Sequence, residues 1–261
     1  MFYEPARRGF AEFVGAFTLT FVGAGAALTF TKLFAAAFAQ GASDTASGLG
    51  LVGIALAHGL AIAVMVSALG HISGGHFNPA ITLGFFVTRR IAGSLTLVYW
   101  LAQFAGATLA ALLLRWFFTK QVRNLGQLGT PTLGSGISHW QGFVIEIILT
   151  FFLVWVVFAT AADPGGTFKS IAGLAIGLTI TMDVLMGGPL TGAAMNPSRA
   201  FGPELVQHHW TNWWVWYAGP AAGALIAAVT YEWLYLRVRP LPVGPPESGV
   251  IEPRPGETSV S

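Results

Sequence analysis

Two asparagine–proline pairs are the residues best suited to chemistry, because each can both start a helix and offer an amide to a ligand. They stand in the triplets Asn78-Pro79-Ala80 and Asn196-Pro197-Ser198. Asparagine accepts hydrogen bonds from the N–H groups of a helix start, and proline suits the first helical position. Each pair therefore predicts a short helix, with the glycine-rich stretch before it as an extended lead-in.

Two such helix starts facing each other would bind a neutral, hydrogen-bonding molecule and repel a cation. Each start carries roughly half a positive charge. The amides of Asn78 and Asn196 can both donate to one passing oxygen, and a water held in this way cannot hand a proton along a file. The lead-ins should supply backbone carbonyls as acceptors, namely those of Gly74, Gly75, His76, Phe77, Gly192, Ala193, Ala194 and Met195.

Arg199 is predicted to lie on the path that a molecule passing the two asparagines would follow. It follows Asn196 by three residues, and so it shares a face of the predicted helix with that amide. A guanidinium inside a membrane is costly and usually functional. We therefore predict that Arg199 faces the path and does not belong to a structural ion pair.

The other titratable residues give no catalytic or metal site, and the sequence predicts no cofactor. Cysteine is absent, which excludes disulfides, thiolate ligands and cysteine nucleophiles. His71 and His76 lie five apart in a predicted loop, but no nearby carboxylate or cysteine completes a metal site. Asp183 is expected to face a loop or vestibule. Glu12 and Glu146 have structural roles, with a place at the interface near helix ends as an open alternative.

The elements that must position these residues are six apolar spans. Of the 261 residues, 54% are hydrophobic and 9% are charged, whereas soluble proteins carry about 25% charged residues. Lipid is therefore the expected solvent, and the net charge of +2 gives no reason to expect nucleic acid as a partner. Segments near the roughly 20 residues that a membrane helix needs occur at 10–31, 49–70, 91–114, 142–162, 170–188 and 213–236.

An even number of spans places both ends of the chain on one side of the membrane. Lysine and arginine are more numerous on that side, which predicts cytoplasmic termini. We expect 1–9 to form a cytoplasmic N-terminal segment and the proline-rich 239–261 to form a disordered cytoplasmic tail. The expected location is the cell membrane, that is, a plasma or inner membrane.

The pore domain, predicted at 10–238, holds two copies of one pattern. Glu12-Phe-Val-Gly-Ala-Phe recurs as Glu146-Ile-Ile-Leu-Thr-Phe, which places repeat 1 at about 10–118 and repeat 2 at about 141–238. Because each copy has three spans, which is an odd number, the second copy must lie upside down in the membrane relative to the first. Each copy also contains a piece too short to cross, which is typical of a central pathway. We predict an all-α membrane protein with six transmembrane helices and two half-helices in an inverted internal repeat.

From residue 8 to residue 238 the sequence resembles the major intrinsic proteins, the aquaporins and aquaglyceroporins. The resemblance rests on Ser-Gly-Gly-His-Phe-Asn-Pro-Ala-Ile-Thr-Leu-Gly and on Gly-Ala-Ala-Met-Asn-Pro-Ser-Arg-Ala-Phe-Gly-Pro. It implies the aquaporin fold, a homotetramer with one pore per subunit, and a role for Glu12 and Glu146 in holding the half-helix loops. It also implies an outer constriction, the selectivity filter, at His58, Val184, Ala193 and Arg199.

The filter set of histidine, aliphatic residue, small residue and arginine is similar to that of plant tonoplast intrinsic proteins, some of which also pass ammonia or urea. Ser198 replaces an alanine of the family, and its hydroxyl can bond back to the helix start, so we expect a small packing change. The resemblance implies a passive water channel that excludes protons and ions, with ammonia, urea and hydrogen peroxide as further neutral permeants.

Two alternatives remain open. A facilitator for glycerol and small polyols would share the fold, but glycerol facilitators typically have aspartate and Pro-Leu where this chain has Ala200 and Trp216-Tyr217. An ion-coupled transporter or an intramembrane enzyme would need facing carboxylates or a titratable relay, and the intramembrane ionisable residues are too few for one.

Overall fold

The structure is a computed structural model that describes residues 3–39, 44–166 and 169–237, and within these ranges it contains helices and turns without a strand. The α-helices are α1 (Tyr3–Ala39), α2 (Asp44–Ser73), α3 (Pro79–Val87), α4 (Gly93–Phe117), α5 (Lys120–Leu125), α6 (His139–Val157), α7 (Ala172–Thr191), α8 (Pro197–Gln207) and α9 (Val215–Tyr231). Short 3-10 segments lie at Gln127–Gly129 and Lys169–Ile171, and π-turns at Phe158–Ala162 and Glu232–Leu236. The predicted tail at 239–261 lies outside the described residues.

Six helices span the membrane. Helices α1, α2, α4 and α7, and α6 together with its π-turn, are each long and apolar enough to cross a bilayer. Helix α9 has 17 residues, and its own π-turn lengthens it to Leu236. The first span was predicted at 10–31, whereas α1 begins at Tyr3, because Glu4 pairs with Arg7 at 3.1 Å and with Arg8 at 2.9 Å and continues the helix outside the apolar stretch.

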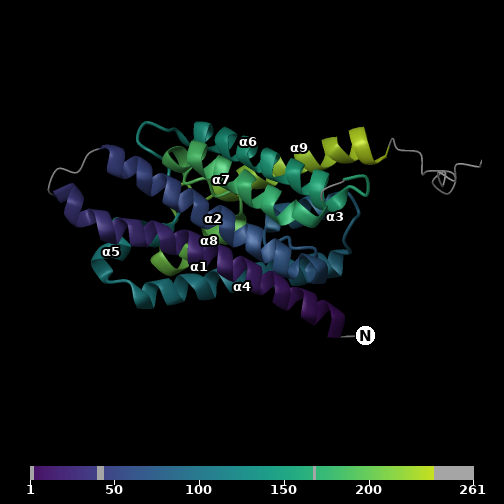
Figure 1. The fold of residues 1–261 in the computed structure, drawn as a ribbon, viewed down its shortest axis with the longest axis horizontal. Helices are drawn as coiled ribbons and strands as arrows, with labels where there is room; N and C mark the ends of the chain where they lie inside the picture. Colours follow the sequence, from purple (N-terminus) through teal and green to yellow (C-terminus); the bar gives the residue numbers. More distant parts are fainter. Residues whose placement is uncertain (1–2, 40–43, 167–168, 238–261) are drawn as a thin grey trace, which may run out of the picture.

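The two copies of the pattern pack in the same way. Helix α1 packs against α4 and α2, its counterpart α6 packs against α9 and α7, and α2 contacts α7 where the copies meet. The spans run roughly along one axis, and the beginning of α1 and the end of the helical segment that continues α9 lie at the same end of the bundle (Figure 1). The prediction of an all-α membrane protein with inverted repeats and two half-helices is confirmed.

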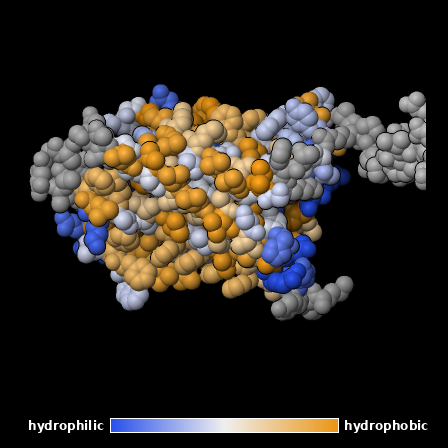
Figure 2. All heavy atoms as spheres, viewed as in Figure 1, coloured by the Kyte–Doolittle hydropathy of each residue, from blue (hydrophilic) through white to orange (hydrophobic). Residues whose placement is uncertain are grey.

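Matching glycines allow the closest helix contacts. A Cβ on Gly106 of α4 would lie 2.3 Å from the carbonyl oxygen of Phe13, and a Cβ on Gly223 of α9 would lie 2.3 Å from that of Ile147. Lipid gives no hydrophobic force between helices, so small residues that let backbones approach are what stabilise such packing. The face of the bundle seen in Figure 2 is apolar instead: hydrophobic residues cover its middle, and hydrophilic residues gather toward the ends.

Candidate functional site

A buried glutamate holds the lead-in of the first half-helix. Glu12 of α1 is 0% exposed. Its Oε1 accepts hydrogen bonds from the hydroxyl of Ser73 (2.6 Å) and the N–H of His76 (3.0 Å), and its Oε2 accepts from the N–H of Phe77 (2.5 Å) and from the amide of Gln103 (2.8 Å). The N–H groups of the irregular chain are thereby satisfied inside the protein, which an apolar solvent requires.

The second repeat reproduces this arrangement. Glu146 of α6 is also 0% exposed. It accepts hydrogen bonds from the hydroxyl of Thr191 (2.7 Å) and from the N–H groups of Ala194 (2.9 Å) and Met195 (2.8 Å). An interfacial position for the two glutamates, which the sequence left open, is therefore wrong: both lie in the protein interior.

Two further pairs of matched residues support the lead-ins, and the sequence analysis missed them. Besides bonding the glutamates, the hydroxyl of Ser73 accepts from the N–H of Gly75, and that of Thr191 accepts from the N–H of Ala193. Tyr99 donates to the carbonyl of Ser73, and Trp216 donates to that of Thr191. A signal was present, since a hydroxyl residue stands five positions before each Asn-Pro pair.

Both half-helices are capped by their asparagines and are cross-linked at their starts. The side-chain oxygen of Asn78 accepts from the N–H of Ala80 (2.8 Å), and that of Asn196 accepts from the N–H groups of Ser198 (3.0 Å) and Arg199 (3.2 Å). The amide nitrogen of Asn78 donates to the carbonyl of Met195 at 2.8 Å, and that of Asn196 donates to the carbonyl of Phe77 at 2.9 Å. These reciprocal bonds hold the starts of α3 and α8 together.

The cross-links leave one donor on each asparagine. An amide NH2 group has two N–H donors, and the described structure uses one of them on each residue. The side-chain oxygens accept the hydrogen bonds of the helix caps, so the amide groups cannot rotate to exchange the positions of their oxygen and nitrogen. Asn78 and Asn196 therefore each present a fixed N–H, and both residues line a central cavity.

The predicted backbone acceptors are divided among several roles. Gly75, His76, Ala193, Ala194 and Met195 line the central cavity. The other two glycines line two further hollows, one at each end of the cavity. Gly74 lines the one that we call the inner hollow, and Gly192 lines the one that we call the outer hollow. Phe77 is 0% exposed and does not line the cavity, because its ring packs at Gly15. The carbonyls of Phe77 and Met195 already accept the amides of Asn196 and Asn78.

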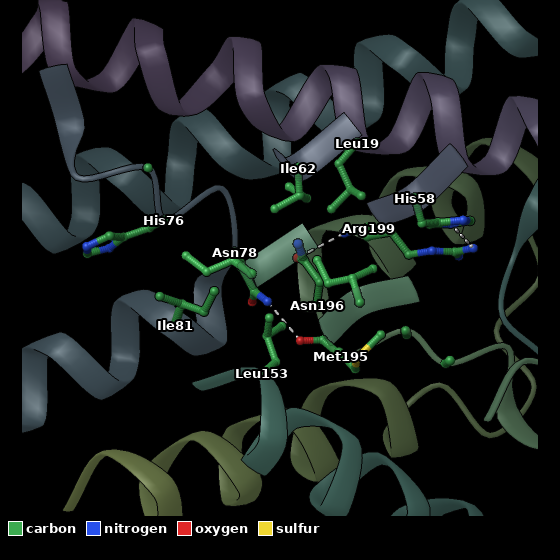
Figure 3. A pocket seen from close by; sticks show the side chains of 15 residues that line it. Leu19, His58, Ile62, His76, Asn78, Ile81, Leu153, Met195, Asn196 and Arg199 are labelled. Atoms are coloured by element: carbon green, nitrogen blue, oxygen red, sulfur yellow. Dashed lines mark hydrogen bonds between the residues drawn. The ribbon is translucent and has the colours of Figure 1, made fainter. Parts of the chain in front are cut away.

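The wall of the central cavity is partly polar and partly apolar. Asn78, Asn196 and Arg199 follow one another along the cavity, with His76 toward one end and His58 toward the other (Figure 3). The apolar lining was missed by the sequence analysis, and it is formed by Leu19, Ile62, Ile81, Leu153, Ile176 and Ile180. Because these side chains offer no hydrogen bond, a polar molecule in the cavity must bond to the polar residues, to backbone carbonyls or to its own neighbours.

Arg199 is held by two acceptors at the outer end of the cavity. It is 4% exposed, and it donates to the carbonyl of Gly129 at 2.9 Å and to Nε2 of His58 at 3.3 Å. His58 Nδ1 lies 2.9 Å from the carbonyl of Ile54. A carbonyl only accepts, so Nδ1 carries the proton and His58 is a neutral imidazole whose Nε2 accepts from the guanidinium.

The structure brings the four residues of the implied filter together. His58 and Arg199 line both the central cavity and the outer hollow, which makes them the boundary between the two. Ala193 lines the central cavity beside them, and Val184 lines the outer hollow. Val184 and Ala193 carry no side-chain polar group, so Arg199 and His58 supply the polar side chains of this constriction.

Two expectations about other titratable residues, Asp183 and His71, were wrong. Asp183 is 1% exposed and does not face a loop or vestibule, and one of its oxygens has no hydrogen-bond partner among the described residues. His71 lies in the last turn of α2 and not in a loop. The ring of His76 is buried between Phe85 and Tyr99, with ring centroids 4.4 Å and 5.2 Å away.

These features together define a class of protein: a membrane channel in which half-helices from two inverted repeats meet in the middle of the path. The sequence profile of the major intrinsic protein family matches residues 3–231. The chain belongs to this family, so the predicted resemblance is confirmed.

Individual relatives are similar over most of their length. The chain is 44% identical over 234 residues to the probable aquaporin TIP3-2 of Arabidopsis thaliana, which covers 89% of this chain and 85% of the relative. It is 42% identical over 234 residues to the probable aquaporin TIP-type RB7-18C of Nicotiana tabacum, covering 89% of each. The fold is similar to the X-ray structure of the aquaglyceroporin from Plasmodium falciparum, with a TM-score of 0.75 and 25% identity over 88% of this chain and 96% of that chain.

Proposed function

We propose that the chain is a passive water channel whose path runs through the outer hollow, the central cavity and the inner hollow. The observation that carries the proposal is the pair of fixed N–H donors on Asn78 and Asn196 in a cavity that is otherwise lined largely by apolar side chains. The names of the relatives, which are aquaporins, support the same function. They also favour a transport protein over an enzyme.

Proton exclusion follows from the orientation of the bound water. A water whose oxygen accepts from both asparagines has its own hydrogens directed away from the middle, so neighbouring waters on the two sides cannot pass a proton through it. The starts of α3 and α8 add a positive field of roughly half a charge each at the same place. Arg199 adds a full positive charge at the outer constriction, which opposes cations.

The constriction also supports small neutral solutes as further permeants. Of the four filter residues, Val184 and Ala193 are apolar, and Arg199 and His58 carry the polar side chains. We propose that ammonia, urea and hydrogen peroxide pass at lower rates than water. The glycerol alternative is disfavoured because the place after Arg199 holds Ala200, 0% exposed, and Trp216 is used to support Thr191.

Stopped-flow light scattering on liposomes that contain the purified protein tests the main proposal. Osmotic shrinkage should be faster than in empty liposomes, and the proton conductance should be unchanged. The matched control is Ala193→Trp, whose indole would fill the path beside Arg199 and should return shrinkage to the rate of empty liposomes. Equal rates for the native protein and empty liposomes would remove the water-channel proposal.

The assembly and placement of the chain are part of the proposal. The family resemblance implies a homotetramer, and native mass spectrometry of the purified protein should show four copies. We infer cytoplasmic termini, which protease digestion of sealed vesicles would test. The relatives are named TIP-type aquaporins and do not support the cell membrane that the sequence analysis expected, so the placement we retain is that of an integral, multi-pass membrane protein.

A further inference from the structure

A second hollow lies on the other side of the half-helix starts, away from the path. Its wall includes Pro79 and Leu83 of α3, Trp100 and Phe104 of α4, Pro197 of α8, and Ala221 of α9. We call this group the lipid-facing crevice. It shares no residue with the central cavity, whose wall holds the asparagines that precede the two prolines.

The position of the crevice follows from the half-helices. Helix α3 contacts both α4 and α9, and so does α8. Because the crevice wall contains the first residue of each half-helix, and these starts are bonded to each other, the crevice lies at the depth where the two half-helices meet. In an inverted repeat that depth is the middle of the bilayer, where the surrounding solvent is the ends of lipid acyl chains.

The crevice is open to that solvent. Leu83, Trp100, Phe104 and Ala221 are half-buried. Leu101, the neighbour of Trp100 in sequence, is 63% exposed on α4. The crevice is thus continuous with the apolar surface that lipid covers.

The chemistry of the wall fits hydrocarbon and not water. Pro79 and Pro197 have no backbone N–H, so these two helix starts present no unpaired donor at their first position. The indole N–H of Trp100 donates to the carbonyl of Pro79 at 3.1 Å. The rings of Phe104 and Phe201 pack edge to face, with centroids 5.0 Å apart. A polar ligand would find few partners here, and an empty crevice would forfeit van der Waals contacts.

We propose that the crevice binds the terminal part of one phospholipid acyl chain, which packs against the prolines of both half-helices from the side opposite the path. The small side chain of Ala221 creates the space for it. On the opposite face of α9 the chain cannot enter, because Gly219 and Gly223 bring that face into contact with α6. The inference depends on the membrane placement of the fold and is independent of what the path conducts.

Photolabelling in liposomes tests the proposal. The full-length protein is reconstituted with phosphatidylcholine that carries a diazirine at the terminal carbon of one acyl chain, or near its carboxyl carbon in a parallel sample. After illumination, mass spectrometry locates the label. The terminal probe should modify Leu83, Trp100 and Phe104 about threefold more than the exposed Leu101, the order expected for a few added van der Waals contacts. The carboxyl-proximal probe should not show this preference.

Two variants make the test specific. Ala221→Phe should fill the crevice and reduce its labelling by about threefold, to the level of Leu101. Ile226→Phe adds the same ring at a position of α9 that is 50% exposed, and should leave the crevice labelling as in the native protein. Even labelling along α4 in the native protein, equal effects of the two variants, or weaker labelling of the crevice residues than of Leu101 by the terminal probe would each overturn the proposal. The first and third outcomes need no variant to fold.

Discussion

At the scale of single residues, the contact between Arg199 and His58 sets the chemistry of the constriction. Two donors of the guanidinium are used by the carbonyl of Gly129 and by Nε2 of His58. A guanidinium has five N–H donors in a fixed plane, so others remain for a molecule that passes. Its side chain also takes up the space that separates the outer hollow from the central cavity.

Arg199→Ala should therefore widen the constriction and admit larger solutes. We expect urea permeability to rise about tenfold, which corresponds to about 1.4 kcal/mol of barrier, while water permeability stays high. Urea uptake and osmotic shrinkage of the same liposomes measure both. Arg199→Lys, which keeps the charge but not the planar group, should give an intermediate value, and an unchanged urea permeability in Arg199→Ala would show that the guanidinium does not limit passage.

Glu146 is a residue whose replacement should lower the stability of the protein. In Glu146→Gln, one acceptor oxygen becomes an NH2 donor that faces N–H groups of Ala194 or Met195. Because hydrogen bonds to a charged acceptor are lost, we expect a decrease of about 2–3 kcal/mol in stability. Thermal unfolding of the protein in detergent measures this loss. Glu4→Gln, at the exposed start of α1, should change the midpoint little, and an equal effect of the two variants would argue against a special role for the buried carboxylate.

At the scale of elements, the two half-helices combine a cap, a cross-link and a donor in one asparagine. Asn196→Asp separates these functions. Aspartate caps a helix about as well as asparagine, but it cannot donate to the carbonyl of Phe77, and it adds a negative charge at the midplane. We expect proton conductance above that of the native channel together with lower water permeability, measured with a pH-sensitive dye inside liposomes. A proton conductance of the variant equal to that of the native channel would contradict the role given to the asparagine donor.

Ser198 provides the matched test at a neighbouring position. Its hydroxyl donates to the side-chain oxygen of Asn196 at 2.8 Å, and so it adds to the cap without facing a ligand of its own. Ser198→Ala should leave water permeability and proton exclusion as in the native channel, and lower the stability by about 0.5–1.5 kcal/mol for one lost hydrogen bond. A change in solute selectivity would show that this hydroxyl does more than pack.

At the scale of the whole molecule, the sequence contains no cysteine, so the native channel has no thiol that mercury could bind in a blocking experiment. Mercury salts should not slow osmotic shrinkage of liposomes that contain the native protein. Ala193→Cys places a thiol on the wall of the central cavity beside Arg199, so mercury should block it and a reducing thiol should restore it. Ala218→Cys, on the exposed surface of α9, should remain insensitive, and block of this variant or of the native protein would contradict the assigned path.

Much of the architecture could be predicted from the sequence because it depends on residues that are close together in the chain. Apolar stretches of span length predict the helices, and Asn-Pro pairs predict helix starts at Asn78 and Asn196. The helix limits were less predictable: α1 extends past 10–31 because ion pairs of Glu4 with Arg7 and Arg8 continue it into polar sequence. Hydropathy counts only the part of a helix that lipid surrounds.

The contacts inside the site could not be predicted in the same way, since they join residues far apart in the chain. The bond from Asn196 to the carbonyl of Phe77 spans 119 positions. The apolar wall of the path looks like any other part of a span, because leucine and isoleucine suit lipid, helix packing and a pore equally well. Asp183 is a further example, because only the structure shows that it is buried.

The sequence by itself determined the solvent, the number of spans, the repeat and the two helix starts, because composition and spacing along one chain segment are sufficient for each. Tertiary structure decided which side of each segment faces the path. It fixed the direction of both asparagine amides through reciprocal bonds, set His58 as the acceptor for Arg199, and left the crevice behind Pro79 and Pro197. Those outcomes depend on distances between helices from different repeats, which are set only when the helices pack.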